Sequence, residues 1–252
     1  MKVSIITVSY NSDKTIKDTF DSIRNQTYKN IEYIVIDGNS TDNSISIFQD
    51  NSDIISILTV EKDNGIYDAM NKGIQKATGE IIGILNSDDV YFNNEVIDIV
   101  VEVFQNDKTD IVYGDIQYVS NDLSSVIRNW KSSSYIKGEF KKGWQPPHPA
   151  FFVKKNIYDK IGKFDLNFDI SADFDFMFRA LEIGDFKSKY ISKIFTKMRI
   201  GGKSNNSVKN ILRGNQQILK SFKKHKKFIN PVIFLFNRFS LKLNQFIPKK
   251  VK

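Results

Sequence analysis

The chain has 252 residues, of which 40% are hydrophobic and 13% aromatic, so it is long enough to bury one substantial core. It contains no cysteine, which excludes a disulfide scaffold and any metal site with cysteine ligands. Residues 186–252 carry 18 of the 37 Lys and Arg residues and no acidic residue, whereas residues 1–185 hold 19 basic and 29 acidic residues, so only the C-terminal part attracts anions.

Short apolar runs and helical patterns alternate in the first third of the chain. The opening run is too short for a signal peptide and has no cleavage site behind it, so we expect a cytoplasmic protein. Buried parallel strands are predicted over residues 3–8, 31–36, 54–59 and 81–85. Ile16, Phe20 and Ile23 predict a helix after the first run, and another helix is expected over residues 67–77. This series predicts an α/β nucleotide-binding half whose ligand lies at the carboxyl ends of the strands.

The middle of the chain is less regular. In chain order it predicts a helix over 94–104, an extended segment over 110–118, a strand near 150–153, a short helix from Lys155 and a helix over 171–183. Residues 120–145 show neither a helical nor a strand period, so we expect them to be loop-rich.

An amphipathic helix is predicted after Pro231. Its apolar residues recur mostly at steps of three and four: Val232, Leu235, Phe236, Phe239, Leu243, Phe246 and Ile247. Asn237, Arg238 and Lys242 interrupt the pattern, which therefore falls short of the roughly 20 apolar residues of a membrane span. The helix could pack on the core, or it could lie in the plane of an anionic membrane surface beside a basic cluster. That cluster is Lys220, Lys223, Lys224, Lys226 and Lys227.

Polar and acidic side chains follow each of the four predicted parallel strands. They are Thr7, Ser9, Tyr10 and Asn11, then Asp37, then Asp63 and Asn64, and finally Asp88 and Asp89. Two adjacent carboxylates repel each other unless a cation or hydrogen-bond donors compensate, so Asp88 and Asp89 suggest Mn²⁺ or Mg²⁺. Each of these acids also has an ordinary alternative as a turn or capping residue.

Four segments resemble a known family in their order and spacing. They are residues 3–11 (VSIITVSYN), 33–42 (YIVIDGNSTD), 61–79 (EKDNGIYDAMNKGIQKATG) and 81–89 (IIGILNSDD). Together with residues 147–152 (PHPAFF) and 171–175 (SADFD), they make about the first 200 residues similar to the inverting family 2 glycosyltransferases of the GT-A fold. The GIYDAMNKG core resembles bacterial enzymes that build exported polysaccharides, of the colanic-acid type.

The resemblance implies a fold and a division of the chain. The fold is α/β, with a Rossmann-like nucleotide-binding half, a mixed central sheet and a C-terminal amphipathic helical extension. We therefore expect a GT-A catalytic domain over residues 1–200 and a basic helical extension over residues 201–252.

The resemblance also implies roles for the strand-end residues. Thr7, Ser9, Tyr10, Asp37 and Asp63 would surround the nucleotide. Asp88 would bond the ribose, and Asp89 would bind the metal that bridges the diphosphate. A nucleoside diphosphate leaves with developing negative charge, which a Lewis acid stabilises. Two positions depart from the family pattern, since Gly38 and Asn86 stand where many relatives have Asp.

Inverting transfer needs a base on the acceptor side, opposite the leaving group. The resemblance assigns this role to Asp173, at the start of a predicted helix. Ala172 replaces the Glu that usually precedes it, which leaves Asp175 as a second candidate. Asp173 could instead be a first-turn acid that complements the helix dipole.

Four further residues are candidates for the acceptor or diphosphate region. Trp144 and His148 could form an acceptor wall, or they could simply be packed in the core. Arg199 and Lys203 flank two glycines in a basic loop that could close over the diphosphate, or that could be a plain surface loop.

These observations predict an inverting glycosyltransferase. It would move a sugar from a UDP- or GDP-linked donor to a hydroxyl of a lipid-linked or saccharide acceptor, in surface polysaccharide synthesis at the inner face of the plasma membrane. A nucleotidyltransferase would need a Gly-rich phosphate loop after the first strand, which is missing. A nucleic-acid-binding protein is a further alternative, but residues 186–252 match no base-reading motif, so we expect no nucleic acid partner. An inactive sugar-nucleotide-binding module is disfavoured by Asp88, Asp89 and Asp173.

Overall fold

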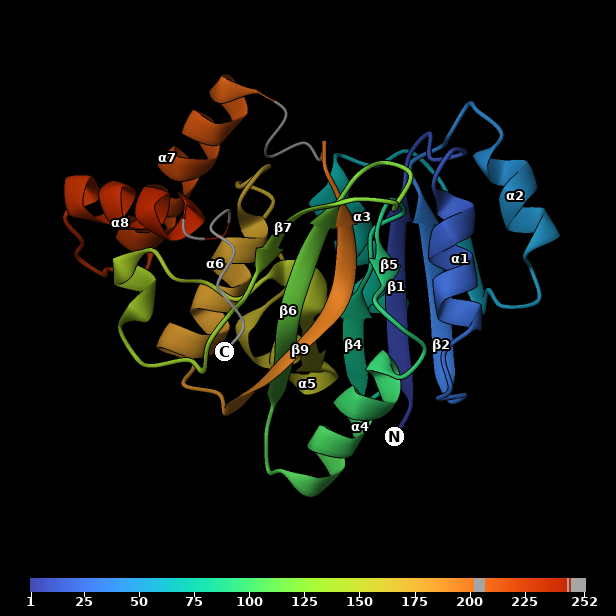
Figure 1. Cartoon of the computed structure of the whole chain (residues 1–252), viewed down its shortest axis with the longest axis horizontal. Helices are drawn as coiled ribbons and strands as arrows, with labels where there is room; N and C mark the ends of the chain where they lie inside the picture. Colours follow the sequence, from blue (N-terminus) through green and yellow to red (C-terminus); the bar gives the residue numbers. More distant parts are fainter. Residues whose placement is uncertain (202–206, 244, 246–252) are drawn as a thin grey trace.

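A computed structural model of the chain describes residues 1–201, 207–243 and 245. Its centre is a nine-stranded sheet in which eight strands run in the order β3-β2-β1-β4-β8-β6-β9-β5, and β7 pairs with β6. Helices cover the faces of this sheet, and two further helices lie at the end remote from α1 and α2 (Figure 1). The α/β class and the mixed central sheet are as the sequence predicts.

The N-terminal half is the predicted series of parallel strands and helices. In chain order its elements are β1 (Val3–Ser9), α1 (Ile16–Arg24), β2 (Ile31–Asp37), α2 (Ser44–Asp50), β3 (Ile57–Val60), α3 (Ile66–Lys76) and β4 (Ile81–Ile84). β1 pairs in parallel with both β2 and β4, and β2 pairs in parallel with β3. β3 begins three residues later than predicted and is only half buried, because it forms the edge of the sheet.

Close packing fixes α3 against this parallel sheet. α3 buries Met70 and Ile74, with Gly73 between them. A Cβ at Gly73 would come 2.4 Å from Cγ2 of Ile6, so only glycine lets the helix lie this close to β1. The residues just before α3 are thereby held at the carboxyl end of the sheet.

The second half of the sheet mixes strand directions. It contains β5 (Val90–Tyr91), α4 (Val96–Asn106), β6 (Ile111–Val119), β8 (Phe151–Lys154), α5 (Lys155–Ile161), α6 (Ala172–Phe178) and β9 (Ser188–Arg199). β8 runs antiparallel to β4 and to β6, whereas β9 runs parallel to β6. α6 continues into a π-helical segment, Arg179–Ile183. The predicted helix over 171–183 is therefore α-helical in its first part and π-helical in its last part.

Three strands of this half are missing from the sequence-based prediction. β5 is only two residues long, and β9 carries lysines between its apolar residues. β7 (Val126–Trp130), together with a 3₁₀ turn at Glu139–Lys142, lies in the segment expected to be loop-rich. β7 is largely exposed, so it lacks the apolar alternation that marks a half-buried strand.

Two C-terminal helices pack beside α6 (Figure 1). α7 spans Val208–Lys224, inside the predicted basic helical extension but without predicted bounds of its own, whereas α8 spans Pro231–Leu243 and begins where the sequence predicts. Phe222 of α7 is buried with its ring centroid 4.7 Å from that of Phe178, and Phe234 of α8 lies 5.5 Å from Phe222. Phe246 and Ile247 of the predicted pattern lie outside the described residues. Within the part of the chain that is described, no helix has the length and apolar character of a membrane span.

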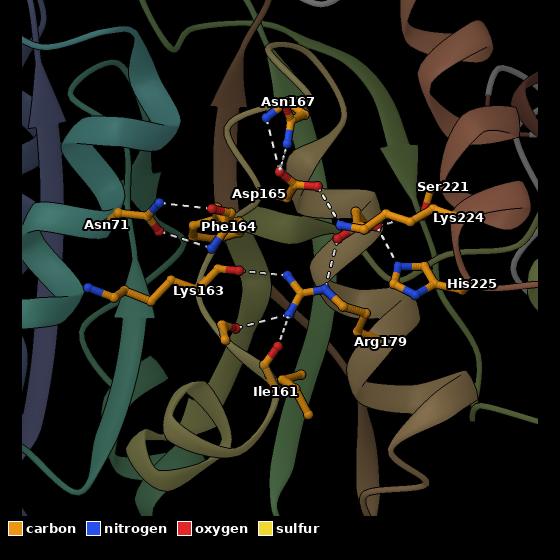
Figure 2. Close-up of polar contacts among 12 residues, drawn as sticks. Asn71, Ile161, Lys163, Phe164, Asp165, Asn167, Arg179, Ser221, Lys224 and His225 are labelled. Atoms are coloured by element: carbon orange, nitrogen blue, oxygen red, sulfur yellow. Dashed lines mark hydrogen bonds and ion pairs between the residues drawn. The ribbon is translucent and has the colours of Figure 1, made fainter.

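A buried polar network joins α6 to α7 (Figure 2). Asp175 accepts hydrogen bonds from Arg179 Nε at 2.8 Å and Ser221 Oγ at 2.7 Å, and its Oδ1 lies 2.9 Å from Nε2 of His225. Arg179 also donates to the carbonyl oxygens of Ile161, Gly162 and Lys163. The network fixes α7 to the domain, and α7 in turn positions α8. The boundary predicted at residue 200 stays a prediction, and the helices after it share the hydrophobic core of the domain.

Candidate active site

A cavity of about 1200 Å³ opens at the carboxyl ends of β1 and β4. Its wall combines residues from distant parts of the chain: Ser9, Tyr10, Asp63, Asp88, Trp144, His148, Asp173, Arg238 and Lys242. The volume exceeds the roughly 300–1,000 Å³ of an ordinary ligand pocket, so the cavity has room for a donor and part of an acceptor.

Three of the predicted nucleotide-binding residues lie together on one wall. Ser9 ends β1, the ring of Tyr10 is 64% exposed, and Asp63 accepts a hydrogen bond from the backbone N–H of Gly65 at 2.8 Å. A Cβ at Gly38 would come 2.7 Å from Oδ2 of Asp63. Glycine at position 38, where many relatives have Asp, therefore leaves room for Asp63 beside the cavity.

Thr7 and Asp37 do not line this cavity. Both are fully buried. The Thr7 hydroxyl donates to the carbonyl of Leu85 at 2.7 Å, and the Asp37 carboxylate accepts from the backbone N–H and the hydroxyl of Ser40 at 2.7 and 2.6 Å. Their hydrogen bonds hold the strand ends in place, and a direct contact of these two residues with a nucleotide stays a prediction.

Asp88 and Asp89 occupy opposite environments. Asp88 lines the cavity, whereas Asp89 is fully buried and is absent from the cavity wall. Burial, followed by the charge of Asp88, raises the pKa of Asp89 well above its ordinary value, and burial raises that of Asp88 as well. Asp88 is therefore the carboxylate exposed to the cavity, and the assignment of the metal to Asp89 stays a prediction.

The end of β4 has the chemistry that a hard divalent cation requires. Among the described residues, Oδ1 of Asn86 and Oδ1 of Asp89 are buried without a hydrogen-bond partner, and Asn86 and Asp88 both line the cavity. Carboxylate and amide oxygens are ligands for Mg²⁺ and Mn²⁺. The described part of the chain has no group of three or more His, Cys, Asp or Glu side chains suited to a metal. A cation here would thus take most of its ligands from substrate phosphates and water.

Arg199 supports Asp88 from behind the wall. Its guanidinium is 3% exposed, donates from Nη1 to the backbone carbonyl of Asp88 at 2.7 Å and pairs with Asp18. Arg199 does not line the cavity, and its contact with a diphosphate stays a prediction. Lys203, the other basic residue of that predicted loop, lies outside the described residues.

Asp173 faces the cavity from the first turn of α6. The hydroxyl of Tyr67, on α3, lies 3.0 Å from Oδ1 of Asp173 and 2.8 Å from the carbonyl oxygen of Ile170. Burial, followed by the negative charge of Asp173, raises the pKa of Tyr67 well above its ordinary value. Tyr67 therefore stays protonated at neutral pH and can orient the carboxylate as a hydrogen-bond donor.

Trp144 and His148 lie on the same side of the cavity as Asp173. Within the described chain, Nε1 of Trp144 and Nε2 of His148 are buried without a hydrogen-bond partner, and both residues line the cavity. Burial lowers the pKa of His148, against the opposing charge of Asp173, which favours a neutral imidazole. Trp144 also packs its ring 5.4 Å from that of Phe140, so it belongs to the wall and to the core at once.

Asp175, the second candidate for the base, is excluded by its position. It is fully buried, and its oxygens bind Arg179, Ser221 and His225. The prediction that it could replace Asp173 is therefore wrong.

No role was predicted for Tyr67, Arg238 or Lys242. Tyr67 lies inside the GIYDAMNKG segment, and its place in that segment is the only feature of the sequence that could have marked it as a site residue. Arg238 and Lys242 stood out only as interruptions of an apolar pattern, and nothing local shows that they face a cavity whose other residues come from as far away as β1.

The arrangement has relatives among known proteins. The profile of the family described as Glycosyl transferase family 2 matches residues 4–168. An uncharacterized glycosyltransferase of Mycobacterium tuberculosis is 33% identical over 181 residues, which cover 71% of this chain and 68% of the relative. A PGL/p-HBAD biosynthesis glycosyltransferase of Mycobacterium bovis is 28% identical over 211 residues, covering 81% of this chain and 80% of the relative.

Solved structures of similar fold include two complexes with sugar nucleotides. S. aureus TarS with UDP-GlcNAc superposes with a TM-score of 0.71 at 18% identity, covering all of this chain and 76% of the other. The mannosyltransferase PcManGT of Pyrobaculum calidifontis, with GDP-Man and Mn²⁺, gives a TM-score of 0.66 at 20% identity, covering 97% and 70%. The profile match and the 33% identical relative agree with the fold, and the chain belongs to glycosyl transferase family 2.

Proposed function

We propose that this glycosyltransferase inverts the anomeric centre of its donor, with Asp173 as base and with a divalent cation held by Asp88. The observation that carries the proposal is that Asp88 and Asp173, from opposite halves of the fold, face one cavity. Ser9, Tyr10 and Asp63 would hold the nucleotide beside Asp88. The donor would thus lie at the ends of the parallel strands and the acceptor hydroxyl near α6.

The chemistry follows from these positions. Asp173, held by Tyr67, accepts the proton of the acceptor hydroxyl as that oxygen attacks the anomeric carbon of the donor sugar. The bond to the nucleoside diphosphate breaks on the opposite face. Bound Mn²⁺ or Mg²⁺ would neutralise the charge that develops on the diphosphate. Asp88, with Asn86 beside it, would hold that cation, and Arg199 would keep the Asp88 backbone in place.

The acceptor is proposed to be a saccharide in glycoconjugate synthesis. The relative assigned to PGL/p-HBAD biosynthesis supports this class, and the GIYDAMNKG segment supports an exported polysaccharide. A UDP- or GDP-linked donor is favoured because structures of similar fold bind UDP-GlcNAc and GDP-Man.

The exposed face of α8 supports work at an anionic membrane surface. Its large apolar side chains Val232, Ile233, Phe236 and Phe239 are all more than half exposed, and Phe228 just before the helix is 87% exposed. Lys223 and Lys226 lie nearby at the end of α7, also exposed. Apolar and basic side chains together are typical of a helix that lies in a membrane interface.

The proposal is tested in two steps. Calorimetry with UDP and GDP, each with and without Mn²⁺, should show metal-dependent binding of one nucleotide by the wild type. A transfer assay with the matching sugar nucleotides and saccharide acceptors should then show turnover. Asp173→Asn should bind the nucleotide like the wild type and lose at least about 100-fold in turnover, because a general base typically contributes this much. Nucleotide binding without turnover against any acceptor would identify an inactive module, and binding of neither nucleotide by a folded protein would refute the site.

A further inference from the structure

α8 turns two basic side chains toward the cavity. Arg238 and Lys242 are four residues apart, so they share one face of the helix, and both line the cavity. Arg128, on β7, lies beside them and also lines the cavity. Its guanidinium is 3.8 Å from the ring centroid of Tyr118, and it donates to the side chain of Gln245, just beyond α8.

The backbone holds Arg238 firmly at this wall. A Cβ at Gly143 would come 2.9 Å from the Cα of Arg238, and Gly143 has a φ of 87° that suits glycine. Arg238 Nη1 donates to Oε1 of Gln145 at 2.8 Å, while its Nε is buried without a hydrogen-bond partner among the described residues. The buried Phe234 anchors the same helix one turn earlier.

No close carboxylate neutralises the charge of Arg238 or Lys242 within the described residues, since neither forms an ion pair with a carboxylate within 4.0 Å. Burial lowers the pKa of Arg238 to about 10, and burial with the charges of Arg238 and Arg128 lowers that of Lys242 to about 8. Partly buried cations that lack a counter-charge are unfavourable unless an anion binds to them.

The cluster lies on the Asp173 side of the cavity. Against the effect of burial, the negative charge of Asp173 raises the pKa of Arg238, whereas the positive charge of Arg199 lowers the pKa of Asp88. Tyr118, which lies under the Arg128 guanidinium, feels the charges of both Asp89 and Asp173, so the cluster lies within the same cavity as the donor site, and an anion bound by Arg238 and Lys242 would lie near Asp173. The same helix carries the exposed apolar face that we assign to the membrane surface, so the cluster lies between that surface and the base.

We propose that Arg238 and Lys242, with Arg128 beside them, form an anion subsite for a phosphate group of the acceptor, so that the acceptor is a saccharide joined to a lipid through phosphate. This rests on the proposed function, because Asp173 marks the acceptor side. Guanidinium and ammonium groups donate charge-assisted hydrogen bonds to phosphate oxygens. One face of α8 would bind the phosphate, and the other face would contact the lipid.

The test uses the full chain with its donor site filled by the nucleotide that binds with Mn²⁺. Farnesyl diphosphate, inorganic pyrophosphate and farnesol are titrated by calorimetry. Farnesyl diphosphate should bind at least about tenfold more tightly than farnesol, and the double variant Arg238→Gln/Lys242→Gln should lose at least about tenfold for farnesyl diphosphate. Nucleotide affinity should be unchanged. Lys209→Gln, which removes one charge from the exposed start of α7, is the matched control and should bind all probes like the wild type.

Several results would overturn the inference. Farnesol binding as tightly as farnesyl diphosphate would show that no phosphate is recognised, and equal affinity for pyrophosphate would refute the lipid attachment. A parallel loss of nucleotide affinity in the double variant would assign the cations to the donor. Arg238→Lys, which keeps the charge, should retain most of the affinity for farnesyl diphosphate. This variant tests the role of the charge if the double variant does not fold. Failure of the wild type to bind any nucleotide would instead refute the proposed function, so the two failures are distinguishable.

Discussion

Asp88 and Asp89 are neighbours in sequence, yet one faces the cavity and the other is fully buried. We expect Asp88→Asn to abolish the gain in nucleotide affinity that Mn²⁺ provides, a loss of at least about tenfold, because the charged ligand is removed. Asp89→Asn should change that affinity by less than about twofold, because burial already favours the neutral acid and Asn has nearly the same shape. Calorimetry of both variants with and without Mn²⁺ measures the difference. Loss of the Mn²⁺-dependent gain in affinity in Asp89→Asn, but not in Asp88→Asn, would instead assign the metal to Asp89.

Tyr67 acts on the reaction through Asp173. Tyr67→Phe removes the hydroxyl that lies 3.0 Å from the Asp173 carboxylate, so the base loses an orienting contact while the donor site is untouched. We expect kcat to fall about tenfold with the KM for the donor unchanged, since misplaced catalytic groups lose rate rather than ground-state binding. Steady-state kinetics give both constants. Tyr28→Phe, which removes a hydroxyl bonded to the Met1 carbonyl, is the control, and a raised KM with normal kcat in Tyr67→Phe would contradict the role.

The sequence located the site better than it located individual contacts. Ser9, Asp63 and Asp173 reach the cavity because each stands at an element end where a side chain meets the ligand. Thr7 and Asp37 stand at similar ends, but their side chains bond within the fold. A motif gives the position of a residue along a strand. Whether its side chain points to the ligand or to the layer below depends on packing partners far away in sequence.

At the scale of elements, the parallel strands were predictable because both faces are covered and their apolar runs are continuous. β9 was not, although it lies inside the sheet between β6 and β5. Its alternating lysines lower the local apolar signal, and its pairing with β6 joins residues about 80 positions apart. α7 lies inside the predicted helical extension, but the helix predicted within that extension began only after Pro231.

The network between α6 and α7 makes a prediction for stability. Burial raises the pKa of Asp175, but the hydrogen bonds of Ser221, Arg179 and His225 outweigh it and leave the pKa below its ordinary value of 3.8. A lowered native pKa stabilises the fold at pH above the ordinary value, and this contribution is lost as the pH falls through the native value. Asp175→Asn should lower the free energy of unfolding by about 3 kcal/mol at neutral pH, because it leaves Arg179 buried without its partner. The difference between wild type and variant should shrink as the pH approaches 3.8 and falls below it.

Denaturant unfolding at a series of pH values measures this difference. Asp185→Asn is the matched control, because it breaks an exposed pair with Lys137 and should change stability by less than about 1 kcal/mol. A pH-independent difference between wild type and Asp175→Asn would show that the Asp175 charge does not contribute as proposed.

The whole molecule separates two surfaces by charge and polarity. The acidic N-terminal part holds the donor site, while the basic C-terminal part supplies α7 and α8 at the other end of the sheet (Figure 1). α8 connects them, since Arg238 and Lys242 face the cavity and the opposite side of the helix is apolar and exposed. This division follows from tertiary packing, because the sequence pattern alone is equally compatible with a helix buried in the core.

Vesicle binding tests the outward face. We expect the protein to bind phosphatidylcholine vesicles that contain phosphatidylglycerol, and to bind much less to phosphatidylcholine alone. Phe236→Ser/Phe239→Ser should weaken binding at least about tenfold through lost apolar contact. Lys223→Gln/Lys226→Gln should weaken it by a similar factor, and only this second effect should diminish at high salt, because salt screens the charges and leaves apolar burial intact.

Sedimentation of the vesicles gives the bound fraction for each variant. Leu58→Ser is the matched control, because Leu58 is an exposed apolar residue on the edge strand β3, at the far end of the sheet. Equal loss in Leu58→Ser would mean that general surface hydrophobicity drives binding. Unchanged binding in the Phe236→Ser/Phe239→Ser variant would place the membrane contact elsewhere and would remove the support that α8 gives to a lipid-linked acceptor. A loss specific to α8, joined with phosphate recognition by Arg238 and Lys242, would show one helix bringing a membrane-bound acceptor to the base.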